Sequence, residues 1–276
     1  MATGKDVTSF HVRHDFTPHL ARETLLLLLA APAISKDDIL DRARAHDLEL
    51  GHRQSADKLL ASLRDLGFVE RADNRAQYAA QLTPLGMRVA TISQKDPLLF
   101  AELIHLRYFF LWPLQGHTDY FSWAYRIVCN ALWNTAPTPL DSGRLVTTVL
   151  IAAEEEFTMT TASFSTASVL GVTNWLRQLS PPCIDGGLFR RRPISSPEAF
   201  TLALKAHQRA TSQTRDAPLE IDSQTREQVC RALLLDEASF EEMLEQATEA
   251  MGLIRRRTTQ SDLVLLRDSF LPELVY

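Results

Sequence analysis

The stretch LLASLRDLGFVERADNRAQYAAQLTPLGMRVA, from Leu59 to Ala90, carries the strongest structural signal in the chain. Its first part places leucines at helical spacing, and Gly67 stands where a left-handed residue commonly ends a helix. Residues 68–69 begin a strand, a polar turn follows, and residues 78–82 supply the return strand. Thr83-Pro84 then opens another helix, because proline is tolerated in a first helical turn. The stretch therefore predicts a helix, a β-hairpin and a second helix in succession.

Two further helices are expected before this stretch. The first runs from about Pro18 to Ala31 and is stopped by Pro32. The second starts near Ser35, which can cap it. A third helix covers about Gln54 to Leu66, so that the region reads helix, helix, helix, hairpin, helix.

This order, with the residues of the opening stretch, resembles winged-helix regulators of the MarR and PadR kind. The resemblance rests on Leu66-Gly67-Phe68-Val69, on the polar wing, and on the run from Leu82 to Gly86. It covers about a quarter of the chain and implies a DNA-binding domain whose third helix enters the major groove.

The same order of elements recurs twice more along the chain. Helices are expected at 119–133, 142–157 and 165–179, followed by a hairpin around Asp185-Gly186-Gly187 and a closing helix at 196–206. Near the C-terminus, residues 251–256 repeat the pattern of 66–71 after two further helices. We therefore predict a mainly α fold with small β-hairpins (α+β), built from tandem winged helix-turn-helix modules. The expected domains are a winged-helix module at 1–96, an aromatic-rich helical region with a second module at 97–210, and a third, shorter module at 211–276.

Composition places the chain among ordinary globular proteins. Of its 276 residues, 45% are hydrophobic and 23% are charged, with a formal net charge of −5. The longest apolar run, residues 25–34, is far shorter than the roughly 20 residues that a bilayer requires, so no membrane association is expected. Three widely spaced cysteines (Cys129, Cys183 and Cys230) indicate a reducing compartment, and we expect the cytoplasm.

Signatures of catalysis are missing from the sequence. It contains no phosphate-binding glycine loop and no GxSxG element. The histidines at 11, 14 and 19 lack the helical setting and the carboxylate partner of a metal site. We therefore expect a protein that is not an enzyme and that uses neither a metal nor another cofactor.

Double-stranded DNA is the expected partner of the first two modules. In the central module the outward face of the third helix carries amide and guanidinium groups without acids, which suits bidentate contacts with bases. In the first module Asp57 and Asp65 share the outward face with basic residues, which makes that helix the weaker candidate. The predicted nucleic-acid contacts are Arg53, Lys58, Arg71, Arg75, Asn174, Arg177, Gln178, Arg190, Arg191 and Arg192.

Two surfaces are candidates for a protein partner or a homodimer. Tyr108 and Phe109 lie in an aromatic segment between modules; such density usually forms a core, but aromatic residues are also enriched at interfaces. In the third module Glu242, Glu245 and Glu249 point outward and would repel phosphate, which suits a basic protein partner. Arg255 to Arg257 could pair with glutamates of the same helix instead of meeting DNA.

Three functions are compatible with this pattern. The first is a non-enzymatic DNA-binding protein, such as a prokaryotic transcriptional regulator. The alternative is a non-catalytic adaptor subunit of a larger nucleic-acid-associated complex, of the kind found in antiphage defence or chromosome organisation. A regulator that responds to a small molecule ranks below both, because no set of residues singles out a ligand.

Overall fold

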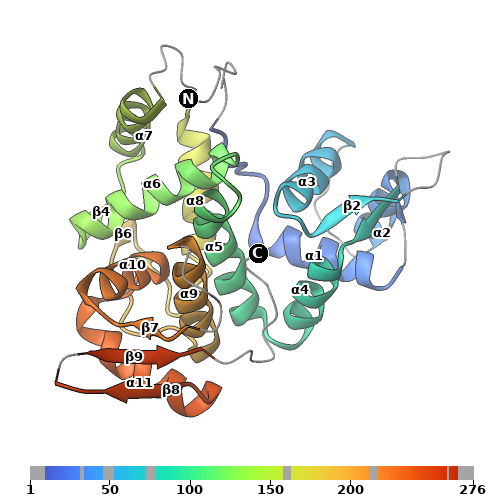
Figure 1. The fold of residues 1–276 in the computed structure, drawn as a ribbon. Helices are drawn as coiled ribbons and strands as arrows, with labels where there is room; N and C mark the ends of the chain where they lie inside the picture. The colour runs from blue at the N-terminus through green and yellow to red at the C-terminus, as the bar shows by residue number, and fades with distance from the viewer. Residues whose placement is uncertain are drawn as a thin grey trace.

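The computed structural model describes residues 10–31, 34–45, 53–72, 79–157, 163–211, 217–259 and 261–266. Within these ranges the chain is mainly helical, with three small antiparallel sheets of three strands each (Figure 1). The prediction of a mainly α fold with small β-hairpins is therefore confirmed. None of the described helices is long and apolar enough to cross a bilayer.

Each sheet belongs to a unit with the same order of elements: helix, short strand, helix, helix, and a two-stranded hairpin. The first unit comprises α1 (Pro18–Leu29), β1 (Ile34–Ser35), α2 (Lys36–Ala45), α3 (Arg53–Asp65), β2 (Val69–Arg71) and β3 (Ala79–Leu82). The central unit comprises α6 (Tyr120–Thr135), β4 (Thr138–Pro139), α7 (Ser142–Phe157), α8 (Thr166–Leu176), β5 (Ile184–Asp185) and β6 (Leu188–Phe189). The third unit comprises α9 (Pro197–Ala210), β7 (Leu219–Glu220), α10 (Ser223–Leu233), the short 3₁₀ helix η1 (Glu237–Ser239), α11 (Phe240–Met251), β8 (Ile254–Arg257) and β9 (Asp262–Leu265).

The pairing of the strands is also the same in the three units. The strand after the first helix pairs with the last strand of the hairpin, which gives the sheet orders β1-β3-β2, β4-β6-β5 and β7-β9-β8. In this order α9 is the opening helix of the third unit, whereas the sequence predicts it as the closing helix of the central module. The two-residue strands β1, β4 and β7 have no counterpart in the sequence-based prediction.

The turn between α3 and the first hairpin shows why the opening stretch folds as it does. Gly67 has a φ of +76°, a conformation that costs glycine little and other residues more. The Thr83 hydroxyl donates to the Gly67 carbonyl (2.7 Å) and accepts from the amide of Gly86 (3.0 Å), which caps α4 (Pro84–Lys95). A Cβ on Gly86 would lie 1.9 Å from the Phe68 carbonyl oxygen, so only glycine allows α4 to approach the hairpin this closely.

Helix α5 (Pro97–Leu114) runs through the middle of the molecule, between the first unit and the other two (Figure 1). It packs against α4, α6 and α9, which leaves almost its whole surface buried. Tyr108 and Phe109 are only 3% and 2% exposed, and Tyr108 stacks on Tyr125 with ring centroids 4.8 Å apart. The prediction of a partner interface at Tyr108 and Phe109 is corrected here, because neighbouring helices of the same chain cover both side chains.

Candidate interaction surfaces

Residues 10–16, which we call the strap, lie between the third helices of the first and central units. On one side the Arg13 guanidinium donates to the Lys58 carbonyl (3.2 Å) and the Ser62 hydroxyl (3.1 Å) of α3. On the other side the Asn174 side chain of α8 donates to the His14 carbonyl (3.4 Å). The strap therefore connects two helices that the sequence places in separate modules.

Aromatic side chains fix the strap in the core. Phe10 and Phe16 are 0% and 1% exposed. The Phe10 ring lies 5.2 Å from the ring of Trp123, and the Phe16 ring lies 5.4 Å from that of Trp175. Each buried phenylalanine contributes roughly 1.5–3 kcal/mol relative to an exposed one. The strap is therefore packed into the core through both phenylalanines.

On α3, the strap occupies the side of the helix that carries Lys58, Ser62 and Asp65. The Lys58 ammonium pairs with Asp15 at 3.2 Å, and Arg13 pairs with Asp65 at 3.2 Å. Burial raises the pKa of Asp65, although the nearby Arg13 opposes the rise. Lys58, a predicted phosphate contact, is thus half-exposed and already balanced by a carboxylate of the strap.

The other predicted contacts of the first unit have different positions. Arg71 is exposed on β2. Arg53 is the first residue of α3, but its side chain lies outside the described residues, as does the whole of Arg75.

On α8, the strap covers the side of the helix that carries Gly171 and leaves Arg177 and Gln178 at its end exposed to solvent. A Cβ on Gly171 would lie 2.7 Å from the Val12 carbonyl oxygen, so the strap backbone rests directly on the helix. Asn174 is partly buried between the strap and Arg177, whose guanidinium donates to the Asn174 side-chain oxygen at 3.4 Å. Arg177 and Gln178 are exposed, as the sequence predicts.

The three arginines after the central hairpin differ in their surroundings. Arg190 is exposed. The Arg191 guanidinium lies over the Trp133 ring at 4.0 Å, and its Nε donates to the Trp133 carbonyl at 3.1 Å. Arg192 is 1% exposed and pairs with the buried Glu102 of α5 at 2.5 Å. The prediction that Arg192 contacts nucleic acid is corrected here, because its charge is neutralised in the interior.

Arg192 is buried because the segment after the central hairpin packs against the third unit. Its guanidinium donates to the carbonyl of Leu233 (3.0 and 2.9 Å), and its backbone amide donates to that of Leu234 (2.8 Å). Helices α5 and α6 hold the same turn, since His105 Nε2 contacts the Ala232 carbonyl at 2.7 Å and Trp133 donates to that of Leu235 at 2.9 Å. The segment after the central hairpin therefore joins the central and third units.

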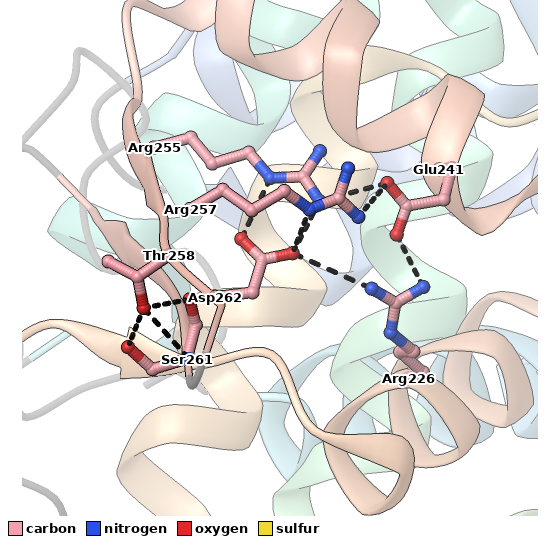
Figure 2. Close-up of polar contacts among 7 residues, drawn as sticks. All are labelled: Arg226, Glu241, Arg255, Arg257, Thr258, Ser261 and Asp262. Carbon is pink, nitrogen blue, oxygen red and sulfur yellow. Dashed lines mark hydrogen bonds and ion pairs between the residues drawn. The ribbon is translucent and has the colours of Figure 1, made fainter.

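In the third unit, five charged side chains tie the hairpin to its helices (Figure 2). Arg255 of β8 pairs with Asp262 of β9 at 2.5 Å and with Glu241 of α11 at 2.8 Å. Arg226 of α10 also pairs with Glu241, and Arg257 lies 3.2 Å from it. The hydrogen bond from Arg255 lowers the pKa of Asp262 despite its partial burial. Two of the three arginines of this hairpin are therefore engaged inside the unit.

The acidic residues predicted for a partner surface lie on the outside of α11. Glu242, Glu245 and Glu249 are all exposed. The partners of Arg255 and Arg257 are Glu241 and Asp262, so this exposed row of glutamates keeps its negative charge available. We call Glu242, Glu245 and Glu249 the acidic face.

The groups with potential for chemistry are the histidines, cysteines and carboxylates of the described ranges. No set of three or more histidine, cysteine or carboxylate side chains is placed there to hold a metal ion. The thiols of Cys129, Cys183 and Cys230 are buried, and burial raises the pKa of each, to about 12 for Cys183 and Cys230. These thiols are protonated near neutral pH, which makes them poor nucleophiles.

Comparison of the chain with protein-family models, with curated proteins and with solved structures found no match.

Proposed function

We propose that the chain is a non-enzymatic protein of three tandem winged-helix units and that it serves as an adaptor in a larger nucleic-acid-associated complex. The recurrent order of elements and the recurrent strand pairing support the winged-helix assignment. Complexes of chromosome organisation and antiphage defence are the settings in which such an adaptor would act.

The observation that carries the adaptor role is that the third helices of two units make contacts within the chain. A winged helix reads DNA by laying its third helix in the major groove, which requires an open outward face. In this chain the strap takes one side of both α3 and α8. Because Phe10 and Phe16 anchor the strap in the core, duplex DNA would have to displace buried aromatic side chains to reach these sides.

The third unit is unsuited to DNA for an electrostatic reason. The acidic face lies on α11, the helix that would enter the groove, and phosphates would repel it. Arg255 and Arg257 do not offset this charge for a ligand, because they pair with Glu241 and Asp262. The acidic face instead complements a basic surface of a protein partner.

The experiment is affinity purification of the tagged full chain from its native cells, followed by measurement of the stoichiometry of co-purifying proteins. We expect a stoichiometric partner, and we expect the triple variant Glu242→Lys, Glu245→Lys and Glu249→Lys to lose it. The matched control reverses two exposed glutamates of α7, Glu154→Lys and Glu155→Lys, and should retain the partner. A chain that purifies without any stoichiometric partner would count against the adaptor role.

Sequence-directed binding of duplex DNA by the central unit is the second candidate function. The exposed Arg177 and Gln178 at the end of α8, and Arg190 after the hairpin, favour it. If these residues meet DNA, neutralising Arg177 should weaken duplex binding by roughly 1–3 kcal/mol, the usual contribution of a bidentate contact to a base. Such a protein could act as a transcriptional regulator.

A further inference from the structure

A groove of about 440 Å³ lies beside the central hairpin, where the central unit meets the third. Three apolar residues line part of it, namely Ala136, Pro137 and Leu188, and two arginines, Arg190 and Arg191, also belong to the lining. Asp236 is the one acidic residue in this lining. Its volume is within the range of sites that hold small molecules.

The Arg191 guanidinium is held in place before any ligand arrives. It stacks on the Trp133 ring at 4.0 Å, and its Nε donates to the Trp133 carbonyl at 3.1 Å. Its nearest acidic partner, Glu237, lies 3.8 Å away and is itself largely exposed. A fixed guanidinium with a long and solvated ion pair can accept a second anion at low conformational cost.

Arg190 supplies the exposed half of the site. Its side chain is exposed, and its backbone is fixed by a hydrogen bond from its amide to the Cys183 carbonyl at 2.8 Å. Two adjacent guanidinium groups on one groove favour a ligand with several anionic oxygens, since each arginine can donate two parallel hydrogen bonds.

We infer that this groove binds a phosphate-bearing small molecule, with Arg190 and Arg191 on the phosphate and Ala136, Pro137 and Leu188 against its apolar part. The oxygens of one phosphate can accept hydrogen bonds from both arginines. The apolar lining residues can contact the rest of the ligand. The inference does not depend on the adaptor role, because no residue of the acidic face or of the strap lines the groove.

The test is a calorimetric titration of the full chain with inorganic pyrophosphate and with adenosine diphosphate. We expect saturable binding of both, tighter for the nucleotide because its base adds apolar contact. Arg190→Glu should weaken binding at least about tenfold, the effect of losing a charge-assisted bidentate contact. Arg191→Lys should also weaken it, because lysine keeps the charge but not the planar fork.

The control is Arg144→Glu, which makes the same charge change on α7, an exposed part of the same unit. We expect this variant to bind as the unchanged chain does. Equal losses in Arg144→Glu and Arg190→Glu would overturn the inference, because the attraction would then be a general effect of charge. It would also be overturned if neither probe bound, or if only a single-stranded oligonucleotide without a terminal phosphate bound in an Arg190-dependent way.

Discussion

Replacing Arg192 with methionine tests whether this residue stabilises the fold through its ion pair with Glu102 or contacts DNA. The side chain is 0% exposed and lies 2.5 Å from Glu102, which is itself 3% exposed. Removing the arginine leaves the Glu102 carboxylate buried without its cation, although Ser196 still donates to it. Breaking one partner of a buried pair typically costs about 3–5 kcal/mol. We therefore expect the free energy of unfolding of Arg192→Met to fall by about that amount.

The assay is urea denaturation followed by circular dichroism, with Arg190→Met as the matched control. Arg190 is exposed and follows the same hairpin, so its substitution should change the free energy of unfolding by no more than about 0.5 kcal/mol. The double variant Glu102→Gln, Arg192→Met should be more stable than the sum of the single changes implies, because no charge is left buried. If Arg192→Met were as stable as Arg190→Met, the proposed role of the pair would be refuted.

Three further results are expected. Gly171→Leu should lower the melting temperature and speed proteolysis near the strap, since its Cβ would lie 2.7 Å from the Val12 carbonyl oxygen; unchanged values of both would contradict the packing of the strap. Burial lowers the pKa of His105 to about 3, so the unfolded chain binds a proton near pH 6.5 that the folded chain does not. Stability should therefore fall as the pH drops from 6.5 towards 3, by up to about 1.4 kcal/mol per pH unit from this group, and a His105→Gln variant that keeps the same slope would exclude His105 as the cause. Asp262→Asn should destabilise the third unit at pH 7 and reduce the acid sensitivity below pH 4, because the lowered pKa of Asp262 contributes stability above its unfolded value and loses it as the pH falls; identical acid unfolding curves for both proteins would rule this out.

The repeated helices and hairpins could be predicted from sequence because their signals are local. Leucines at helical spacing, Gly67 and Thr83-Pro84 each mark a boundary within a few residues of the element they define. The strands β1, β4 and β7 could not be predicted, because two residues show no periodicity and their pairing depends on partners 43 or more positions away, as with Glu220 and Leu263.

The surfaces were harder to predict because distant contacts decide them. Arg192 stands in a basic run that suggests phosphate binding, but its partner Glu102 is 90 positions away. The role of the strap has no local signal either, since Arg13 reaches α3 and His14 reaches α8 only after the chain folds. By contrast, the outward row of Glu242, Glu245 and Glu249 follows from helical periodicity alone and is exposed in the structure.

The most direct test of the adaptor role is a fluorescence anisotropy titration of labelled duplex DNA with the full chain at low and at moderate salt. Because the strap holds α3 and α8 and the acidic face occupies α11, we expect no saturable binding at low micromolar protein. Saturable, salt-sensitive binding that Lys58→Ala or Arg177→Ala weakens would show instead that a third helix reads DNA in spite of the strap.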